Sequence, residues 1–163
     1  MRVTARYKQS GLLGEGDAQR MISIREMTAE DILASRELLA QLGYQMAVEE
    51  VRRRYAVVIR SDSHALIVAE HEGAIVALCH VYARPALDKP PEAVVQALVV
   101  DQTSRGSGVG KLMMDAAERW AVERGFDSVA LSSHVARSDA HAFYKAIGYE
   151  CVATSNSFRK VLR

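Results

Sequence analysis

A glycine-rich stretch, RGSGVGK, runs from Arg105 to Lys111. The apolar run AVVQALVV precedes it, and the helix-like segment KLMMDAAERWAVERG begins at its last residue. Glycines at such a strand-to-helix corner leave backbone N–H groups bare, and these donors attract an anion together with the helix dipole. We therefore predict a phosphate-binding loop, with Arg105 and Lys111 adding positive charge at its rim. A tight turn that uses glycine only for its backbone geometry is the alternative.

Two common phosphate loops do not fit this stretch. A Walker A loop requires G-x-x-x-x-G-K followed by Ser or Thr. When its lysine is aligned on Lys111, the first glycine falls on Arg105 and the hydroxyl falls on Leu112. The dinucleotide fingerprint G-x-G-x-x-G, started at Gly106, would need a glycine in place of Lys111. The stretch therefore argues against an ATP-binding P-loop and against a dinucleotide-binding loop.

Hydrophobic periodicity around this loop predicts a mixed α+β domain. A capping pattern, Thr28 followed by Asp31, begins a helix that Gly43 ends. All three prolines lie in ARPALDKPPE (83–92), which predicts a loop. The expected order is a strand at 22–27, helices at 32–42 and 48–58, paired strands at 65–70 and 74–83, a strand at 93–100, a helix at 109–124, a strand at 129–133, a helix at 139–147, and a closing hairpin of 149–154 with 157–162.

Length and composition are those of an ordinary globular protein. The 163 residues suit one domain over 21–163, whereas residues 1–20 lack a periodic pattern and are predicted to be a disordered extension. A formal net charge of +1 favours neither nucleic acid nor a membrane surface, and no apolar run reaches bilayer length. Cys79 and Cys151 lie in strand-like runs, which predicts buried thiols and a cytoplasmic protein. No set of His, Cys, Asp and Glu has metal-ligand spacing, so we predict no metal site.

The spacing R-x-x-G-x-G is more specific than the glycines alone, and here Arg105, Gly108 and Gly110 carry it. Together with the preceding LVVD (98–101), it resembles the central motif of the GNAT family of N-acetyltransferases. A second match lies downstream, where AHAFYKAIGYE resembles the A-x-x-x-Y-x-x-x-G-[F/Y] helix of that family through Ala140, Tyr144, Gly148 and Tyr149. The two motifs occur in the order of the family, and the resemblance covers residues 22–162.

The resemblance implies the GNAT fold, with a mostly antiparallel central sheet and acetyl-CoA as co-substrate. Its CoA-binding core would consist of the strand at 93–100, the helix after it, the strand at 129–133 and the helix at 139–147. The pantetheine arm would lie like an added strand beside Leu98, Val99 and Val100. The pyrophosphate would be held by backbone N–H groups of Arg105, Gly106, Ser107, Gly108, Val109, Gly110 and Lys111.

The chemistry implied by the resemblance is direct attack of a neutral amine on the thioester carbonyl in a ternary complex. It needs an oxyanion donor, a proton acceptor, and a proton for the leaving thiolate. The Val100 amide would serve the oxyanion and Tyr144 would act as general acid, although core packing is the alternative role for Tyr144. Many relatives carry a glutamate near the position of Gln96, and glutamine can bind an amine or a water but cannot accept the proton. Glu92 on the same strand and His80 on the preceding strand are alternatives that would act through water.

The function implied is an N-acetyltransferase that uses acetyl-CoA to acetylate a primary amine, with a small molecule favoured over a protein or peptide. A sensor module that binds acyl-CoA without turnover is the second hypothesis. Gln96 in place of an acid supports the sensor, whereas the retained Tyr144 opposes it. A homodimer formed through the C-terminal strands is a further option that the resemblance implies.

Overall fold

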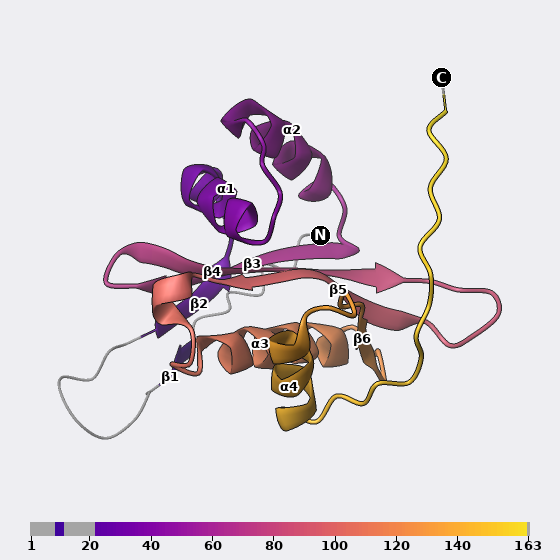
Figure 1. Ribbon diagram of the computed structural model, residues 1–163. Helices are drawn as coiled ribbons and strands as arrows, with labels where there is room; N and C mark the ends of the chain where they lie inside the picture. Colours follow the sequence, from indigo (N-terminus) through magenta and orange to yellow (C-terminus); the bar gives the residue numbers. More distant parts are fainter. Residues whose placement is uncertain (1–8, 12–21, 163) are drawn as a thin grey trace. The chain divides into compact units, whose positions relative to one another are not determined.

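The structure, a computed structural model, describes residues 9–11 and 22–162. The chain divides into two compact units, Met1–Ser132 and Ser133–Arg163, which are considered separately. The first unit contains a six-stranded sheet with helices on both faces (Figure 1). α1 (Ile32–Gln41) and α2 (Val48–Val58) lie on one face, and α3 (Val109–Glu123) lies on the other. The sheet is therefore covered by helices on both sides.

The strands of the sheet follow one another in chain order. They are β1 (Gln9–Gly11), β2 (Ile22–Glu26), β3 (His64–His71), β4 (Ala74–Arg84), β5 (Glu92–Val100) and β6 (Val129–Leu131). Neighbouring strands are antiparallel, except that β5 and β6 are parallel and are joined through α3. Two 3-10 helices, η1 (Ala29–Asp31) and η2 (Gln102–Ser104), complete this unit, and α4 (Ser138–Ala146) belongs to the second. The predicted mixed α+β class with a mostly antiparallel sheet is confirmed.

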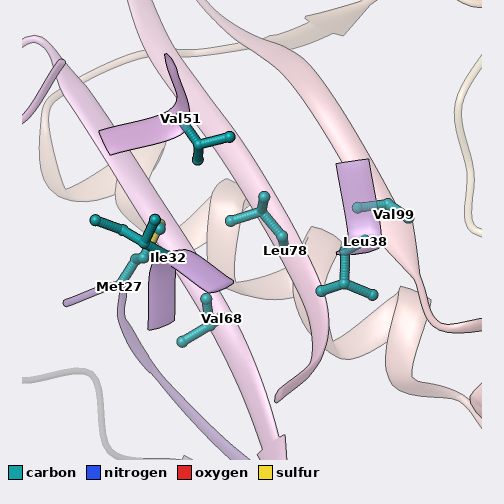
Figure 2. Packing of buried hydrophobic residues seen from close by; sticks show 7 residues of the cluster. All are labelled: Met27, Ile32, Leu38, Val51, Val68, Leu78 and Val99. Atoms are coloured by element: carbon teal, nitrogen blue, oxygen red, sulfur yellow. The ribbon is translucent and has the colours of Figure 1, made fainter. Parts of the chain in front are cut away.

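A hydrophobic cluster fills the layer between the sheet and the first two helices (Figure 2). None of its side chains is more than 8% exposed, so each stabilises the fold by about 2 kcal/mol relative to an exposed position. Helices and strands both contribute to it, and its members are Met27, Ile32, Leu38, Val51, Val68, Leu78 and Val99.

α3 covers the opposite face of the sheet with residues three and four positions apart. β4 turns Ala77, Cys79 and Val81 toward this face, because they alternate with Leu78 of the first cluster. The predicted end of the helix at Gly125 is confirmed, since this glycine takes a φ of +77°. The buried residues of α3 are Val109, Met113, Met114, Ala116, Ala117, Trp120 and Ala121.

Two β-bulges interrupt the pairing of the central strands. The β3–β4 register skips Val76, and the β4–β5 register skips Gln96. A bulge adds one residue to one strand and redirects the side chains beyond it. The β3–β4 turn itself is regular, because Glu72 and Gly73 both take positive φ, at 50° and 79°, as a type I′ hairpin turn requires.

The C-terminal segment differs from the prediction. Residues 149–162 form neither helix nor strand, so the expected closing hairpin is wrong. Val152 and Phe158 are 90% and 91% exposed. A two-stranded hairpin is marginally stable in water, so alternating apolar residues do not form one without a sheet to join. Cys151 is exposed for the same reason, whereas Cys79 is buried as predicted.

The predicted disordered extension, residues 1–20, lies outside the described residues except for β1. The backbone of β1 pairs antiparallel with the first half of β2. Within residues 9–11 and 22–162, none of the helices is long and apolar enough to cross a bilayer. The same part of the chain contains no group of three or more His, Cys, Asp or Glu side chains arranged to hold a metal ion.

A partly buried ion-pair network joins β2, η1 and β3. The guanidinium of Arg25 donates two hydrogen bonds to the carboxylate of Asp31, at 2.7 and 2.8 Å, and a third to Glu70 at 3.0 Å. Asp31 is 5% exposed and also accepts from the backbone N–H of Thr28 at 2.7 Å. The hydrogen bonds from Arg25, and then that from Thr28, outweigh burial and hold the pKa of Asp31 below its ordinary value. The predicted capping role of Thr28 and Asp31 is confirmed.

We expect Asp31→Asn to lower the free energy of unfolding at pH 7 by about 2 kcal/mol, because it leaves Arg25 without its bidentate partner. A lowered pKa in the folded state stabilises above the unfolded value, near 4, and this stabilisation is lost as the pH falls through the folded value. Urea unfolding at pH 7 and pH 3 should therefore show a wild-type advantage that shrinks in acid. The exposed neighbour provides the control, since Glu30→Gln should change little. An equal difference at both pH values would contradict the prediction.

Candidate active site

The glycine loop connects β5 to α3 and has the geometry of an anion site. Gly106 and Gly108 take positive φ, at 76° and 86°, where a side chain would be strained. Gly108 occupies the N-cap of α3, and its carbonyl accepts from Leu112 N–H at 3.2 Å as the helix begins. The N–H groups of residues 109–111 precede that bond and lie outside the helical ladder. The loop can therefore offer several backbone donors at the positive end of a 15-residue helix.

Asp101 fixes the start of this loop. One carboxylate oxygen of Asp101 accepts from the backbone and side chain of Thr103, and the other accepts from Gln41 Nε2 at 2.8 Å. Gln41 Oε1 in turn accepts from the backbone N–H of Gln102 at 3.0 Å. The hydrogen bonds from Thr103, and then that from Gln41, lower the pKa of Asp101 below its ordinary value. The end of α1 is thereby hydrogen-bonded to the beginning of the loop.

The two basic residues at the rim are less available than the sequence suggests. Lys111 forms an ion pair with Asp115 one turn further along α3, at 2.8 Å. Arg105 is exposed, and its Nε donates to the carbonyl oxygen of Val100 at 3.2 Å. Ser107 donates to the carbonyl of Ser104 at 2.5 Å, which closes the loop on itself. Backbone N–H groups thus remain the main donors that the loop can offer.

The C-terminal half of β5 has an open edge among the described strands. β6 pairs with Ala93, Val94 and Val95 and ends there, whereas β5 continues to Val100. On the other side, β4 pairs with β5 up to Val100. The pairing of the two parallel strands therefore ends at Val95, and one edge of residues 96–100 has none of the described strands of the first unit beside it.

The peptide groups at this edge have a defined direction. Asp101 N–H donates to the carbonyl of Val76 at 2.8 Å, which makes Ala77 and Val100 a non-hydrogen-bonded pair of the antiparallel ladder. The N–H of Val100 consequently points away from β4, toward the open edge. Peptide direction alternates along a strand, so Leu98 shares it and Val99 faces β4. Leu98 and Val100 can therefore bind an extended chain laid along β5.

The β5 bulge places Gln96 beside this edge. Gln96 is exposed, whereas Val95 and Val94 before it are buried. The bulge thus turns a polar side chain out of the strand at the point where β6 ends. On β4, His80 is paired with Ala97, the next residue after Gln96.

Glu92 lies at the opposite end of β5 and is held by two cations. Its Oε1 accepts from Lys89 Nζ and from Arg84 Nη2, each at 2.5 Å. These hydrogen bonds, that from Lys89 first, lower the pKa of Glu92 below its ordinary value. A carboxylate in this state is a weaker proton acceptor than an ordinary glutamate, and its contacts favour a role in closing the loop between β4 and β5.

Comparison with known proteins shows the family of the chain that carries this loop and strand. The acetyltransferase (GNAT) family model matches residues 28–149, about three quarters of the chain. The chain belongs to the acetyltransferase (GNAT) family. It is therefore an acetyl-CoA-dependent acetyltransferase. An uncharacterized N-acetyltransferase of Bacillus subtilis, YhdJ, is 30% identical over 125 residues, which are 76% of this chain and 88% of that protein.

A mouse protein, N-alpha-acetyltransferase 80, shares 34% identity over 71 residues, 44% of this acetyltransferase and 21% of its own length. The fold is also that of solved acetyltransferases. The aminoglycoside N-acetyltransferase AAC(6')-Iy in complex with CoA superposes with a TM-score of 0.81 at 19% identity, covering 89% of this chain and 98% of that one. A putative acetyltransferase from Agrobacterium tumefaciens gives 0.77 at 23% identity, with 85% and 99% covered.

Tyr144 of the acetyltransferase lies in the second unit, on the last turn of α4. It is half-buried, and its ring contacts Phe143 and Tyr149 at centroid distances of 5.2 and 6.0 Å. The backbone N–H of Tyr149 donates to its carbonyl at 2.9 Å as Gly148 ends the helix with a φ of +96°. The helix predicted over residues 139–147, with Gly148 ending it, is thus confirmed, and the role of Tyr144 stays a prediction.

One polar residue of the first unit was absent from the sequence-based set. His64 of β3 lies 2.9 Å from His80 of β4, measured from Nδ1 to Nε2. No pattern in the sequence indicates this contact, because it depends on how β3 pairs with β4 and on the bulge at Val76.

Proposed function

We propose that this acetyltransferase binds acetyl-CoA along β5 and the glycine loop and transfers the acetyl group to a primary amine of a small molecule. The observation that carries the proposal is the continuity of two donor sets. Peptide groups of Leu98 and Val100 point toward the open edge of β5, and the N–H groups of the loop follow it at the start of α3. In an extended pantetheine arm that ends in a diphosphate, amide carbonyls come first and phosphate oxygens follow. These acceptors would meet the two sets of N–H donors in the same order.

The residues of the glycine loop would have different roles in binding the diphosphate. Gly106 and Gly108 allow backbone to approach the diphosphate, while Val109, Gly110 and Lys111 supply N–H groups. Arg105 and Ser107 keep the loop in shape through their bonds to Val100 and Ser104. Backbone N–H groups would therefore make most of the contacts to the diphosphate, and the side chains would only need to leave these groups accessible.

For the reaction, the protein must stabilise the oxyanion, orient the amine and protonate the leaving thiolate. The N–H of Leu98, which lies further from the diphosphate loop along β5 than that of Val100, is proposed to stabilise the negative charge that develops on the thioester oxygen as the C–N bond forms. Gln96, exposed on its bulge, would orient the acceptor amine or a water beside it. As the C–S bond breaks, the hydroxyl of Tyr144 would give its proton to the leaving sulfur. The bonds that hold Glu92 favour a structural role for that carboxylate.

Several similar folds belong to proteins whose names specify aminoglycoside N-acetyltransferases, which supports a small-molecule amine as acceptor. The partial match to mouse N-alpha-acetyltransferase 80 supports the alternative, a peptide α-amine. A near-neutral chain carries no strong field for a polyanionic or strongly acidic partner, and this favours the small molecule slightly.

The test is a panel of amines incubated with acetyl-CoA and followed by release of the CoA thiol. The panel should include aminoglycosides, polyamines, amino acids and peptides with free α-amines. We expect kcat/KM for at least one small amine to exceed that for every peptide by tenfold or more. A better peptide would support the protein acceptor instead. Thermal stabilisation by acetyl-CoA without acetylation of any amine would support the sensor.

A further inference from the structure

A three-ring cluster lies on the face of the sheet that carries α1 and α2, near the start of β3 and the end of β4. His64 Nδ1 and His80 Nε2 are 2.9 Å apart, so one ring donates a hydrogen bond to the other. The ring of Tyr82 stacks on His64 with a centroid distance of 5.5 Å and an interplanar angle of 20°. All three side chains are half-buried. The cluster therefore combines a fixed geometry with access to solvent.

The cluster reaches from β3 to the bulge of β5. His80 is paired with Ala97, which follows Gln96 and precedes Leu98. Paired residues of antiparallel strands have Cα atoms about 5 Å apart. His80 therefore stands on β4, across β5 from the open edge that is proposed to hold the thioester, and His64 stands one strand further away.

We propose that His80 and His64 form a relay that carries away the proton lost by the attacking amine. The inference rests on the proposed function, because it assigns the proton acceptor that Gln96 cannot provide. His80 would be the receiving end, near β5, and His64 the releasing end, on β3.

The proton balance of the relay follows from the chemistry of imidazole. Each neutral ring holds one proton, so the bonded pair has one bare nitrogen at its ends. In the receiving state, His80 Nε2–H donates to His64 Nδ1, and His80 Nδ1 is bare. As the amine forms its C–N bond, its N–H bond breaks and the proton passes through water, across the face of β5, to His80 Nδ1. The proton on Nε2 then moves to His64 Nδ1, and His64 releases its own Nε2 proton to solvent.

The surroundings of His80 suit a group that passes a proton on. Burial first, and then the neighbouring His64, lower the pKa of His80 to about 4, so the ring is neutral near pH 7 and its acceptor nitrogen is free of a proton. The lowered pKa weakens His80 as a base, as it does Glu92, and His80 differs in its bond to a second ring that can take the proton onward. Several ionisable groups nearby have contacts of their own. Among them are Tyr82 on His64, Arg84 and Glu92 paired with each other, and Tyr55 of α2, whose hydroxyl donates to the carbonyl of Met27.

The experiment replaces each ring by a side chain that can hydrogen-bond but cannot relay. We expect His80→Gln and His64→Gln each to lower kcat about 100-fold, with little change in KM for the amine or in the Kd of acetyl-CoA. The ratio of the residual rate to the wild-type rate cancels the rising fraction of neutral amine, and it should increase with pH above neutrality, because hydroxide then removes the proton in the variants. Free imidazole should restore part of the activity of His80→Ala. His71→Gln, at the other end of β3, and Tyr82→Phe, which keeps the stacked ring, are the controls and should remain near wild type.

The outcomes separate this inference from the proposed function. Acetylation of an amine at the wild-type rate by both glutamine variants would overturn the relay and leave the proposed function intact. A loss of activity without imidazole rescue and with an unchanged pH profile would also overturn it, since a structural role predicts that result. Absence of acetylation by the wild-type protein would overturn both.

Discussion

Gly108→Glu should weaken acetyl-CoA binding about 100-fold, a loss near 3 kcal/mol. Two effects add. Gly108 has a φ of +86°, where any side chain is strained, and it caps the helix whose N–H groups are proposed to hold the diphosphate. A carboxylate there would face a group of its own charge, and unit charges about 4 Å apart near a protein surface repel by several kcal/mol. Isothermal titration with acetyl-CoA and with CoA measures the effect.

A matched control exists at the other end of the same helix. Gly125 also has a positive φ, at 77°, and it follows the C-terminus of α3, about 22 Å along the axis. Gly125→Glu should cost stability through the same backbone strain and leave acetyl-CoA affinity unchanged. Gly108→Ala should lie between wild type and Gly108→Glu, because it adds strain without charge. Equal affinity in wild type and Gly108→Glu would show that the diphosphate binds elsewhere.

Tyr144→Phe should lower kcat about 100-fold while the Kd of acetyl-CoA changes less than twofold. The substitution removes the proton proposed for the leaving thiolate and keeps the ring that contacts Phe143 and Tyr149. Steady-state kinetics together with a binding titration separates these two quantities.

The neighbouring tyrosine provides the comparison for this variant. Tyr149→Phe removes a hydroxyl from the same ring cluster, at a position where the family motif admits either residue. We expect it to retain most of the activity. An unchanged kcat in Tyr144→Phe would remove that hydroxyl from the mechanism, and equal losses in the two variants would indicate a packing role.

Local patterns in the sequence were sufficient for most elements of the first unit. Helix positions followed from apolar residues spaced three and four apart and from glycines that end helices, as at Gly43 and Gly125, which both take positive φ. The glycine loop was recognised because its donors belong to the backbone and its signal is the spacing of residues that lack side chains. The direction of the peptide groups at Leu98 and Val100 could not be recognised from the sequence, since it depends on the register with the partner strand β4.

Features that depend on pairing between distant segments could not be predicted. A continuous register from the turn at Glu72 and Gly73 would pair His64 with Val81 and put His64 and His80 on opposite faces. The bulge at Val76 shifts the register by one residue, so His64 pairs with Tyr82 and meets His80. The prediction of a C-terminal hairpin was wrong for a related reason. An alternating apolar pattern forms a strand only when a neighbouring strand pairs with it.

The conformation of Gly106 and Gly108 also determines how this loop can change over generations. Binding through peptide groups tolerates mutation at Ser107, whose side chain serves only the loop itself. At the two glycines, any substitution adds a Cβ atom to a residue in a left-handed conformation, so both positions must remain glycine to avoid strain. In the proposed binding mode, recognition of the acetyl donor would thus be encoded at very few sites. Side chains elsewhere can diverge toward new acceptors without disturbing it.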